Sequence, residues 1–177
     1  MSLTIGIDFD SYALHVCGLP DDGGPPCEVS ASIRKRGDDE HRAFTMVASA
    51  FASATRHIRD TTGIEAVSGV WIERGYGASR KADFVLGAIY GATFVAVGHV
   101  LPGVAARPLL AADWKRDVTG EMGITTKTGG RGNGNVKKEV ANDCARQLWQ
   151  REWPFTIVPT DPNLLDSFSI AWAGSRL

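Results

Sequence analysis

The sequence has almost no excess of charge of either sign. Its 177 residues carry 19 Lys and Arg against 20 Asp and Glu, a formal net charge of -1 at pH 7. Proteins that attract nucleic acid through their overall field are strongly basic. Any polyanionic partner of this chain must therefore be held by local basic patches, and the composition counts against a nucleic-acid-binding protein.

Cysteine is scarce and shows no motif. The three cysteines are Cys17, Cys27 and Cys144, without C-x-x-C spacing and without a secretory signal before them. An odd number of unpatterned thiols predicts a reduced, cytoplasmic protein of a bacterial or host cell rather than a disulfide-stapled one. The histidines also lack the spacing of zinc ligands, so no structural zinc is expected.

A long uninterrupted hydrophobic span is missing too. Residues 84–106 carry no formal charge, but Gly98-His99 and Pro102-Gly103 interrupt them. The continuous part, 84–97, would be roughly 20 Å long as a helix, against roughly 30 Å of membrane hydrocarbon. We expect a buried helix and no membrane partner.

What the chain does contain is the pattern of an α/β protein. A hydrophobic content of 44% over 177 residues is enough for one core, so a single domain over 1–177 is expected. Three successive strands are predicted at 3–8, 12–19 and 29–36, then a helix to about residue 60 and a strand at 67–73. Further helices are predicted at 80–97, from 113, at 136–150 and after Asp161-Pro162, with an edge strand at 104–111. The crossover helix makes the first and fourth strands parallel neighbours.

Carboxylates stand where this arrangement would bring them together. Asp8 ends the first strand, Glu73 ends the fourth, and Asp166 follows Asn163 by three residues on the last helix. Taken singly, each acid has an ordinary explanation as a solvated strand end or a helix-dipole partner. Taken together, they predict a site for hard divalent cations of the kind used in phosphoryl chemistry.

Four segments in order resemble the RuvC-type Holliday junction resolvases of the RNase H and retroviral integrase superfamily. They are "TIGIDFDSY", "VWIERGYGASRKAD", "DWKRDVTG" with "VKKEV", and "NLLDSFSIAWA". The resemblance implies an RNase H-like α/β fold, a five-stranded mixed sheet of order 3-2-1-4-5 with helices on both faces. It also implies a nuclease of DNA recombination and repair.

The same resemblance implies a site with two Mg2+ ions, replaceable by Mn2+. Its ligands would be Asp8, Glu73 and Asp166, with Asn163 where the family usually has an acid or a histidine. Asparagine offers a carbonyl oxygen but no charge, so Asp161 or Asp10 could compensate, although Asp161 is also a natural helix cap. Lys115 and Lys137 would act near the scissile phosphate, or else be solvated surface lysines.

Tyr76 stands where the family places an aromatic residue that stacks on bases, although it could equally be a packed loop tyrosine. The residues expected to bind DNA are Arg74, Tyr76, Arg80, Lys81, Lys115, Arg116, Lys127, Arg131, Lys137 and Lys138. The glycine-rich stretch 120–135 is expected to be a loop, either a flap that DNA orders or an inert insertion.

The function implied by the resemblance is symmetric cleavage of Holliday junctions or other branched DNA, giving 5' phosphate ends. Two symmetric cuts require a homodimer, formed through the apolar helix at 84–97. Two alternatives stay open: a catalytically weak junction-binding protein, which Asn163 favours, and an actin-like sugar kinase, for which 177 residues are too few.

Overall fold

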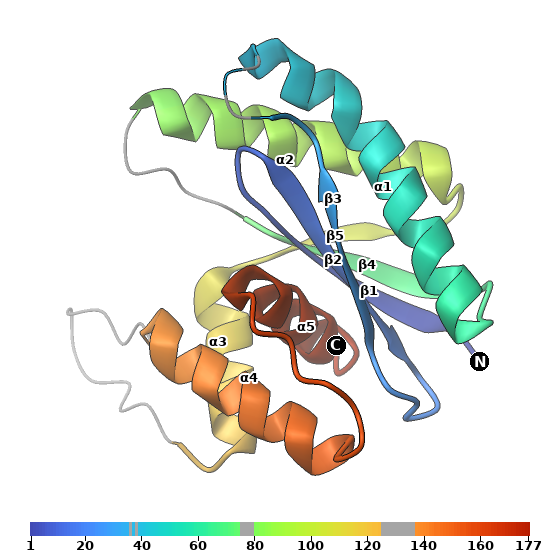
Figure 1. Cartoon of the computed structure of the whole chain (residues 1–177), viewed down its shortest axis with the longest axis vertical. Helices are drawn as coiled ribbons and strands as arrows, with labels where there is room; N and C mark the ends of the chain where they lie inside the picture. Colours follow the sequence, from blue (N-terminus) through green and yellow to red (C-terminus); the bar gives the residue numbers. More distant parts are fainter. Residues whose placement is uncertain (36, 38, 75–79, 125–136) are drawn as a thin grey trace.

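The computed structural model describes residues 1–35, 37, 39–74, 80–124 and 137–177. Its elements form three layers, with α1 and α2 on one face of a central sheet and α3, α4 and α5 on the other (Figure 1). Tyr76, Lys127 and Arg131, three of the residues expected to bind DNA, lie outside the described residues, as does most of the glycine-rich stretch.

The first three strands form the antiparallel meander predicted from the sequence. They are β1 (Leu3–Phe9), β2 (Ala13–Pro20) and β3 (Cys27–Ser32). In the β1–β2 ladder Asp8 pairs with His15, and in the β2–β3 ladder His15 pairs with Ser30. Paired residues point to the same face of a sheet, so these three side chains lie on one face.

Two parallel strands complete the sheet. β4 (Val67–Glu73) lies beside β1, with Ile72 opposite Ile7, and β5 (Ala106–Leu109) forms the outer edge. The order β3-β2-β1-β4-β5 confirms the expected fold class. β5 is shorter than the predicted 104–111, and Pro108 lies at the sheet edge, where its missing N–H is tolerated.

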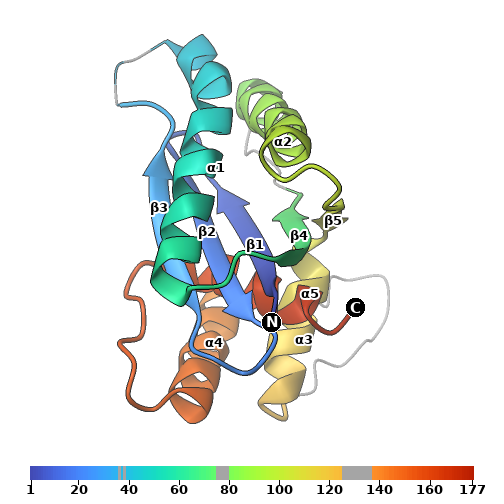
Figure 2. The ribbon, with the colours of Figure 1, turned by 90° about the vertical axis from the view of Figure 1, so that its right-hand side faces the viewer.

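The helices α1 (Glu40–Thr62) and α2 (Arg80–Val100) cover one face of the sheet (Figure 2). The apolar stripe of α1 packs on β1–β3 through Val47, Phe51 and Ile58, all fully buried. α2 buries Val85, Ile89 and Val97 in the same cluster.

The expectation for α2 is corrected in two respects. The helix continues through Gly98-His99 to Val100, because a single glycine lowers helix stability without ending the helix. The segment Asp83–Val100 is long enough and apolar enough to cross a membrane, but helices in protein cores meet the same two criteria. The helix is also buried on one face only, since α2 is an outer layer, and Phe84 and Val95 are 70% and 74% exposed.

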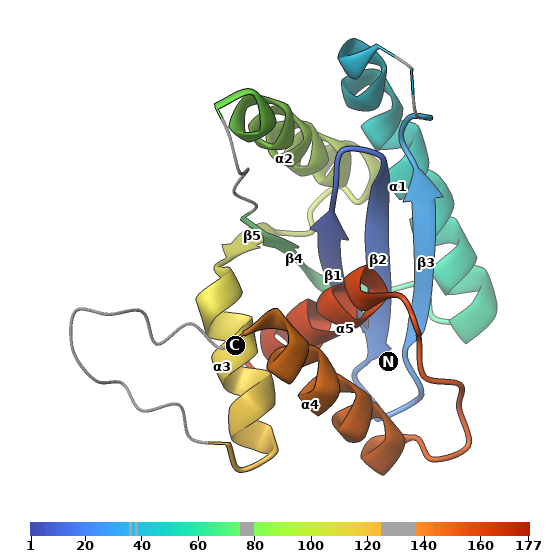
Figure 3. The same ribbon diagram turned by 60° about the vertical axis from the view of Figure 1, so that its left-hand side comes forward.

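The opposite face carries α3 (Ala111–Glu121), α4 (Lys138–Glu152) and α5 (Pro162–Gly174), which Figure 3 shows grouped below the strands. α5 lies directly on β1. Gly6 makes this close approach possible, because a Cβ at this position would lie 2.2 Å from the Ser167 carbonyl oxygen. This contact between Gly6 and α5 holds Asp166, the residue before Ser167, close to β1.

Candidate active site

The strand ends bring the first two candidate acids together. Asp8 and Glu73 each follow the last residue of the parallel β1–β4 register, the pair Ile7–Ile72, and emerge at the carboxyl edge of the sheet. This edge is where parallel α/β sheets bind their ligands. Trp114 of α3 donates a hydrogen bond from Nε1 to Glu73 Oε2 over 2.9 Å, and this fixes the direction of the Glu73 side chain.

Asp166 reaches the same region from α5. Its side chain is buried, and Oδ1 has no hydrogen-bond donor in the part of the chain that the structure describes. The other oxygen, Oδ2, lies 2.5 Å from Lys138 Nζ. A buried carboxylate oxygen without a donor is costly, so this atom points to a ligand that would satisfy it.

Burial raises the pKa of all three carboxylates. Burial raises the pKa of Asp8 well above its ordinary value, and the charges of Glu73 and Asp166 raise it further. Burial also raises the pKa of Glu73 despite the Trp114 hydrogen bond, and raises the pKa of Asp166 despite Lys138. The charge of Asp166 adds to the rise in the pKa of Glu73, as nearby carboxylates do. The structure therefore places Glu73 and Asp166 near enough to Asp8 for their charges to act on it.

Two lysines face this acidic group. Lys138, the first residue of α4, contacts Asp166, and although desolvation opposes it, this hydrogen bond raises the pKa of Lys138. Lys115 on α3 lies with its Nζ 5.3 Å from the centre of the Trp114 ring, and its charge lowers the pKa of Glu73 and Asp166. Lys137, expected near the scissile phosphate, is the exposed N-cap residue of α4. The contact with Asp166 is made instead by Lys138, which the sequence indicated only as a DNA-binding residue.

Asn163 completes the group, whereas the two suggested substitutes are engaged elsewhere. Asn163 Oδ1 accepts a hydrogen bond from Lys138 Nζ over 3.3 Å. Asp161 caps α5 by accepting from the Asn163 backbone N–H over 2.9 Å. Asp10 Oδ1 accepts from the backbone N–H groups of Tyr12 and Ala13 in the turn after β1.

The chemistry of these donors suits a divalent cation. Carboxylate and amide oxygens are the ligands that Mg2+ prefers, and Asp166 Oδ1 is available to one. As the side chains stand, however, no three His, Cys, Asp or Glu residues among those described form a group that could hold a metal ion. The Lys138 ammonium, a cation already in contact with Asp166, occupies part of the space in which a metal would bind. The roles of these residues as ligands stay predictions.

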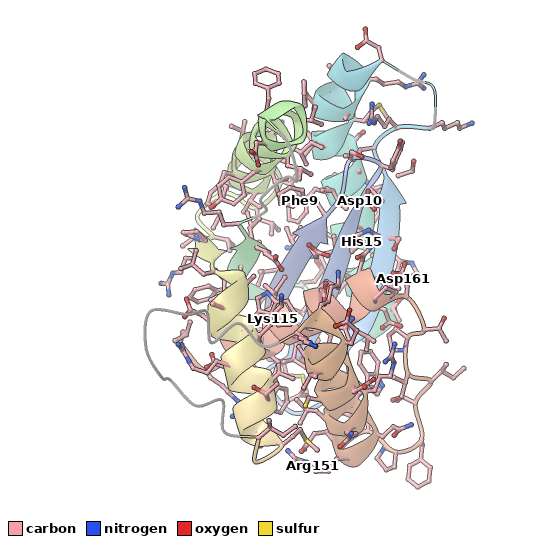
Figure 4. The ribbon with its side chains drawn as sticks, turned by 90° about the vertical axis from the view of Figure 1, so that its left-hand side faces the viewer. Phe9, Asp10, His15, Lys115, Arg151 and Asp161 are labelled. Atoms are coloured by element: carbon pink, nitrogen blue, oxygen red, sulfur yellow. The ribbon has the colours of Figure 1, made fainter. Side chains whose placement is uncertain are left out.

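The basic residues expected to bind DNA are distributed unevenly. Lys115 on α3 and Lys138 at the start of α4 lie near the carboxylates, and Lys137 is the N-cap residue of α4. Figure 4 shows Lys115 on α3 and Arg151 at the far end of α4. Arg116 is paired with Asp113 and Asp117, so part of its charge is neutralised. Arg80 and Lys81 begin α2.

A groove of about 660 Å³ opens at Arg74, the residue that follows β4. Its lining residues come from the end of β4, from α2 and from the turn between β5 and α3: Arg74, Asp83, Gly87, Tyr90, Pro108, Leu110 and Asp113.

Sequence reasoning missed two groups in this region. Trp114 orients Glu73 through its hydrogen bond. A tryptophan in a helix is more often a core residue, so its place in the sequence did not indicate this role. His15 lies 3.4 Å from Asn163, measured from Nε2 to Nδ2, and only the antiparallel register of β1 and β2 could have revealed it.

Comparison with known proteins gives a match in structure only. No protein-family model matches the sequence, and a search of curated proteins finds no similar sequence. The structure of Thermus thermophilus RuvC in complex with a Holliday junction substrate superposes with a TM-score of 0.66 at 12% identity, covering 98% of this chain and 92% of that chain. Another T. thermophilus RuvC structure gives a TM-score of 0.63 at 15% identity, covering 97% and 92%. The chain therefore has the RNase H-like fold of the RuvC Holliday junction resolvases.

Proposed function

We propose that this protein is a metal-dependent endonuclease that resolves Holliday junctions or other branched DNA. The observation that carries the proposal is the group of three carboxylates, in which Glu73 and Asp166 raise the pKa of buried Asp8 and Asp166 Oδ1 has no donor among the described residues. The group lies at one edge of the sheet, and T. thermophilus RuvC, whose structure contains a Holliday junction substrate, has the same fold. The two lines of support are independent, because one is local chemistry and the other is topology.

Asp8, Glu73, Asp166 and Asn163 Oδ1 would hold Mg2+ or Mn2+. Bound there, divalent ions would activate water and stabilise the leaving 3' oxygen, so that hydrolysis leaves 5' phosphate ends. Lys138 would have to release Asp166 when an ion binds, and its ammonium would then be free to face a phosphate. Lys115 would offset negative charge at the Glu73 side of the site.

Resolution of a junction needs two symmetric cuts, and α2 offers a surface for a homodimer. Phe84 and Val95 are exposed on this helix, and Gly87, Gly91 and Gly98 have open space around them. Positions 84, 87, 91, 95 and 98 fall on one side of a helix, where small residues permit close approach of a second backbone. A symmetric pair would thereby carry two active sites.

One observation favours the second candidate function, a junction-binding protein with weak catalysis. Lys138 neutralises part of the acidic group, and Asn163 adds no charge to it, so a metal would be held less firmly than by four acids. In this function the basic residues on α3 and α4 would bind the DNA backbone without cleavage.

Synthetic four-way junctions distinguish the two functions. We expect Mg2+ to give paired nicks with 5' phosphate ends, and we expect a chelator or Asp166→Asn to abolish them while junction binding persists. Asp143→Asn is the matched control, because Asp143 is an exposed acid on α4 that pairs with Arg146, and this variant should cleave normally. Binding without cleavage by the wild type would select the second function, and failure to bind junctions would reject both.

A further inference from the structure

His15 is a buried imidazole that the proposed chemistry does not use. It lies on β2 directly opposite Asp8, and only 4% of its surface is exposed. Figure 4 shows its side chain on the sheet face that carries α5, near the start of that helix. A buried histidine needs partners for both ring nitrogens, and those partners define what it can do.

The hydrogen bonds around Asn163 fix the proton on this imidazole. Lys138 Nζ can only donate, so the amide atom that faces it at 3.3 Å is the oxygen Oδ1. The amide NH2 of Asn163 therefore faces His15 Nε2, at 3.4 Å. An amide NH2 also only donates, so Nε2 accepts and the ring proton is on Nδ1, which donates to Ser30 Oγ over 2.8 Å.

The competing partner of Nε2 is weaker. Asp10 Oδ2 lies 3.6 Å from Nε2, longer than an ordinary hydrogen bond, and although burial opposes it, this contact with His15 lowers the pKa of Asp10. The other oxygen of Asp10 is held by the turn after β1, which keeps this carboxylate at its own site. The geometry thus favours one chain of donors, from Lys138 to Asn163 and from Asn163 to His15.

We propose that His15 is a positioning residue that holds the Asn163 amide with its oxygen toward Asp166, so that a neutral side chain can serve as a ligand of the divalent ion. The inference rests on the proposed function, because it assigns His15 to the same metal centre. Without this restraint the asparagine amide can rotate and turn its NH2 group toward the cation. The cation and the NH2 group then repel each other. A carboxylate at position 163 would need no such restraint, because both of its ends are oxygen.

This difference between an amide and a carboxylate gives the test. Mn2+ binding to the full chain without DNA is measured by calorimetry for the wild type and for His15→Leu, Asn163→Ala and the double variant. We expect each single variant to bind Mn2+ about 10- to 100-fold more weakly, the usual effect of losing a partner of a metal ligand. We expect the double variant to bind no more weakly than Asn163→Ala, because both changes remove one interaction.

Two further variants separate positioning from general support of the fold. In an Asn163→Asp background, His15→Leu should change Mn2+ affinity by less than about 2-fold, within the scatter of independent sites. His57→Leu, an exposed histidine on α1, is the control and should bind as the wild type does. His15→Gln should keep most of the affinity, because its amide oxygen can still accept from Asn163.

The outcomes distinguish the inference from the function beneath it. The positioning role is wrong if the wild type and His15→Leu bind Mn2+ with the same affinity. It is also wrong if His15→Leu lowers Mn2+ affinity as much in the Asn163→Asp background as in the wild type. In both cases the nuclease proposal stands. If the wild type binds no Mn2+, the metal centre fails and the positioning role fails with it. If His15→Leu does not fold, the 15N shifts of His15 in the wild type decide, since a proton on Nε2 instead of Nδ1 would overturn the inference.

Discussion

Replacing Gly6 with alanine should separate α5 from the sheet. Gly6 lies in the middle of β1, paired with Cys17 on one side and Trp71 on the other. An added Cβ would lie 2.2 Å from the Ser167 carbonyl oxygen and 2.3 Å from the Ala171 backbone nitrogen. Real Cβ atoms essentially never approach closer than 3.0 Å, and both obstructing atoms are backbone, so no side-chain rotation relieves the clash.

The cost follows from the rigidity of both elements. Inserting a methyl group into a packed core destabilises by roughly 1–3 kcal/mol, and a clash with helix backbone belongs at the upper end of that range. For a chain of this length, about 3 kcal/mol lowers the melting temperature by roughly 6–12 °C. Because α5 carries Asp166, its withdrawal also moves this acid away from Asp8, and Mn2+ binding should weaken.

Urea unfolding of the purified protein measures the loss, and Gly120→Ala is the matched control. Gly120 lies near the end of α3 with no atom within 4 Å of an added Cβ, so alanine there should be neutral or stabilise by up to about 1 kcal/mol. A Gly6→Ala variant whose unfolding free energy lies within about 0.5 kcal/mol of wild type, the range of ordinary surface substitutions, would refute the close packing of α5 on β1.

Three further outcomes are expected. Burial, with the charges of Glu73 and Asp166, raises the pKa of Asp8, so Asp8→Asn should stabilise the metal-free protein by roughly 1 kcal/mol at pH 7. This advantage should shrink as pH falls toward about 4, where Asp8 is protonated in the folded wild type. Thermal melts of both proteins across pH check this, and an advantage of Asp8→Asn that grows toward low pH would contradict it. Lys138→Met should bind Mn2+ more tightly in calorimetry, because the ammonium no longer competes for Asp166; weaker binding would show that Lys138 supports the metal site. Val95→Arg should shift the protein from dimer to monomer in analytical ultracentrifugation, because a charge would be placed in the exposed face of α2, and an unchanged mass would exclude that face as the interface.

Much of the fold could be predicted because its signals are local. The strand β4 was predicted with the bounds it has, Val67–Glu73, from a run of β-branched and aromatic residues that ends on an acid. The start of α5 was predicted from Asp161 as the N-cap followed by Pro162. The extent of α2 was wrong at its end, since a lone glycine carries too little penalty to stop a helix that packs along its length.

The sequence by itself determined which acids could meet, because strand ends and crossover direction follow from hydrophobic period and chain order. Only the tertiary structure decided which groups surround them. That Lys138 rather than Lys137 contacts Asp166 depends on the rotation of α4 about its axis, which one residue changes by about 100°. Turn and cap hydrogen bonds engage Asp10 Oδ1 and Asp161 Oδ1. That His15 faces Asn163 depends on strand register. These are long-range contacts, and no local pattern of residues encodes them.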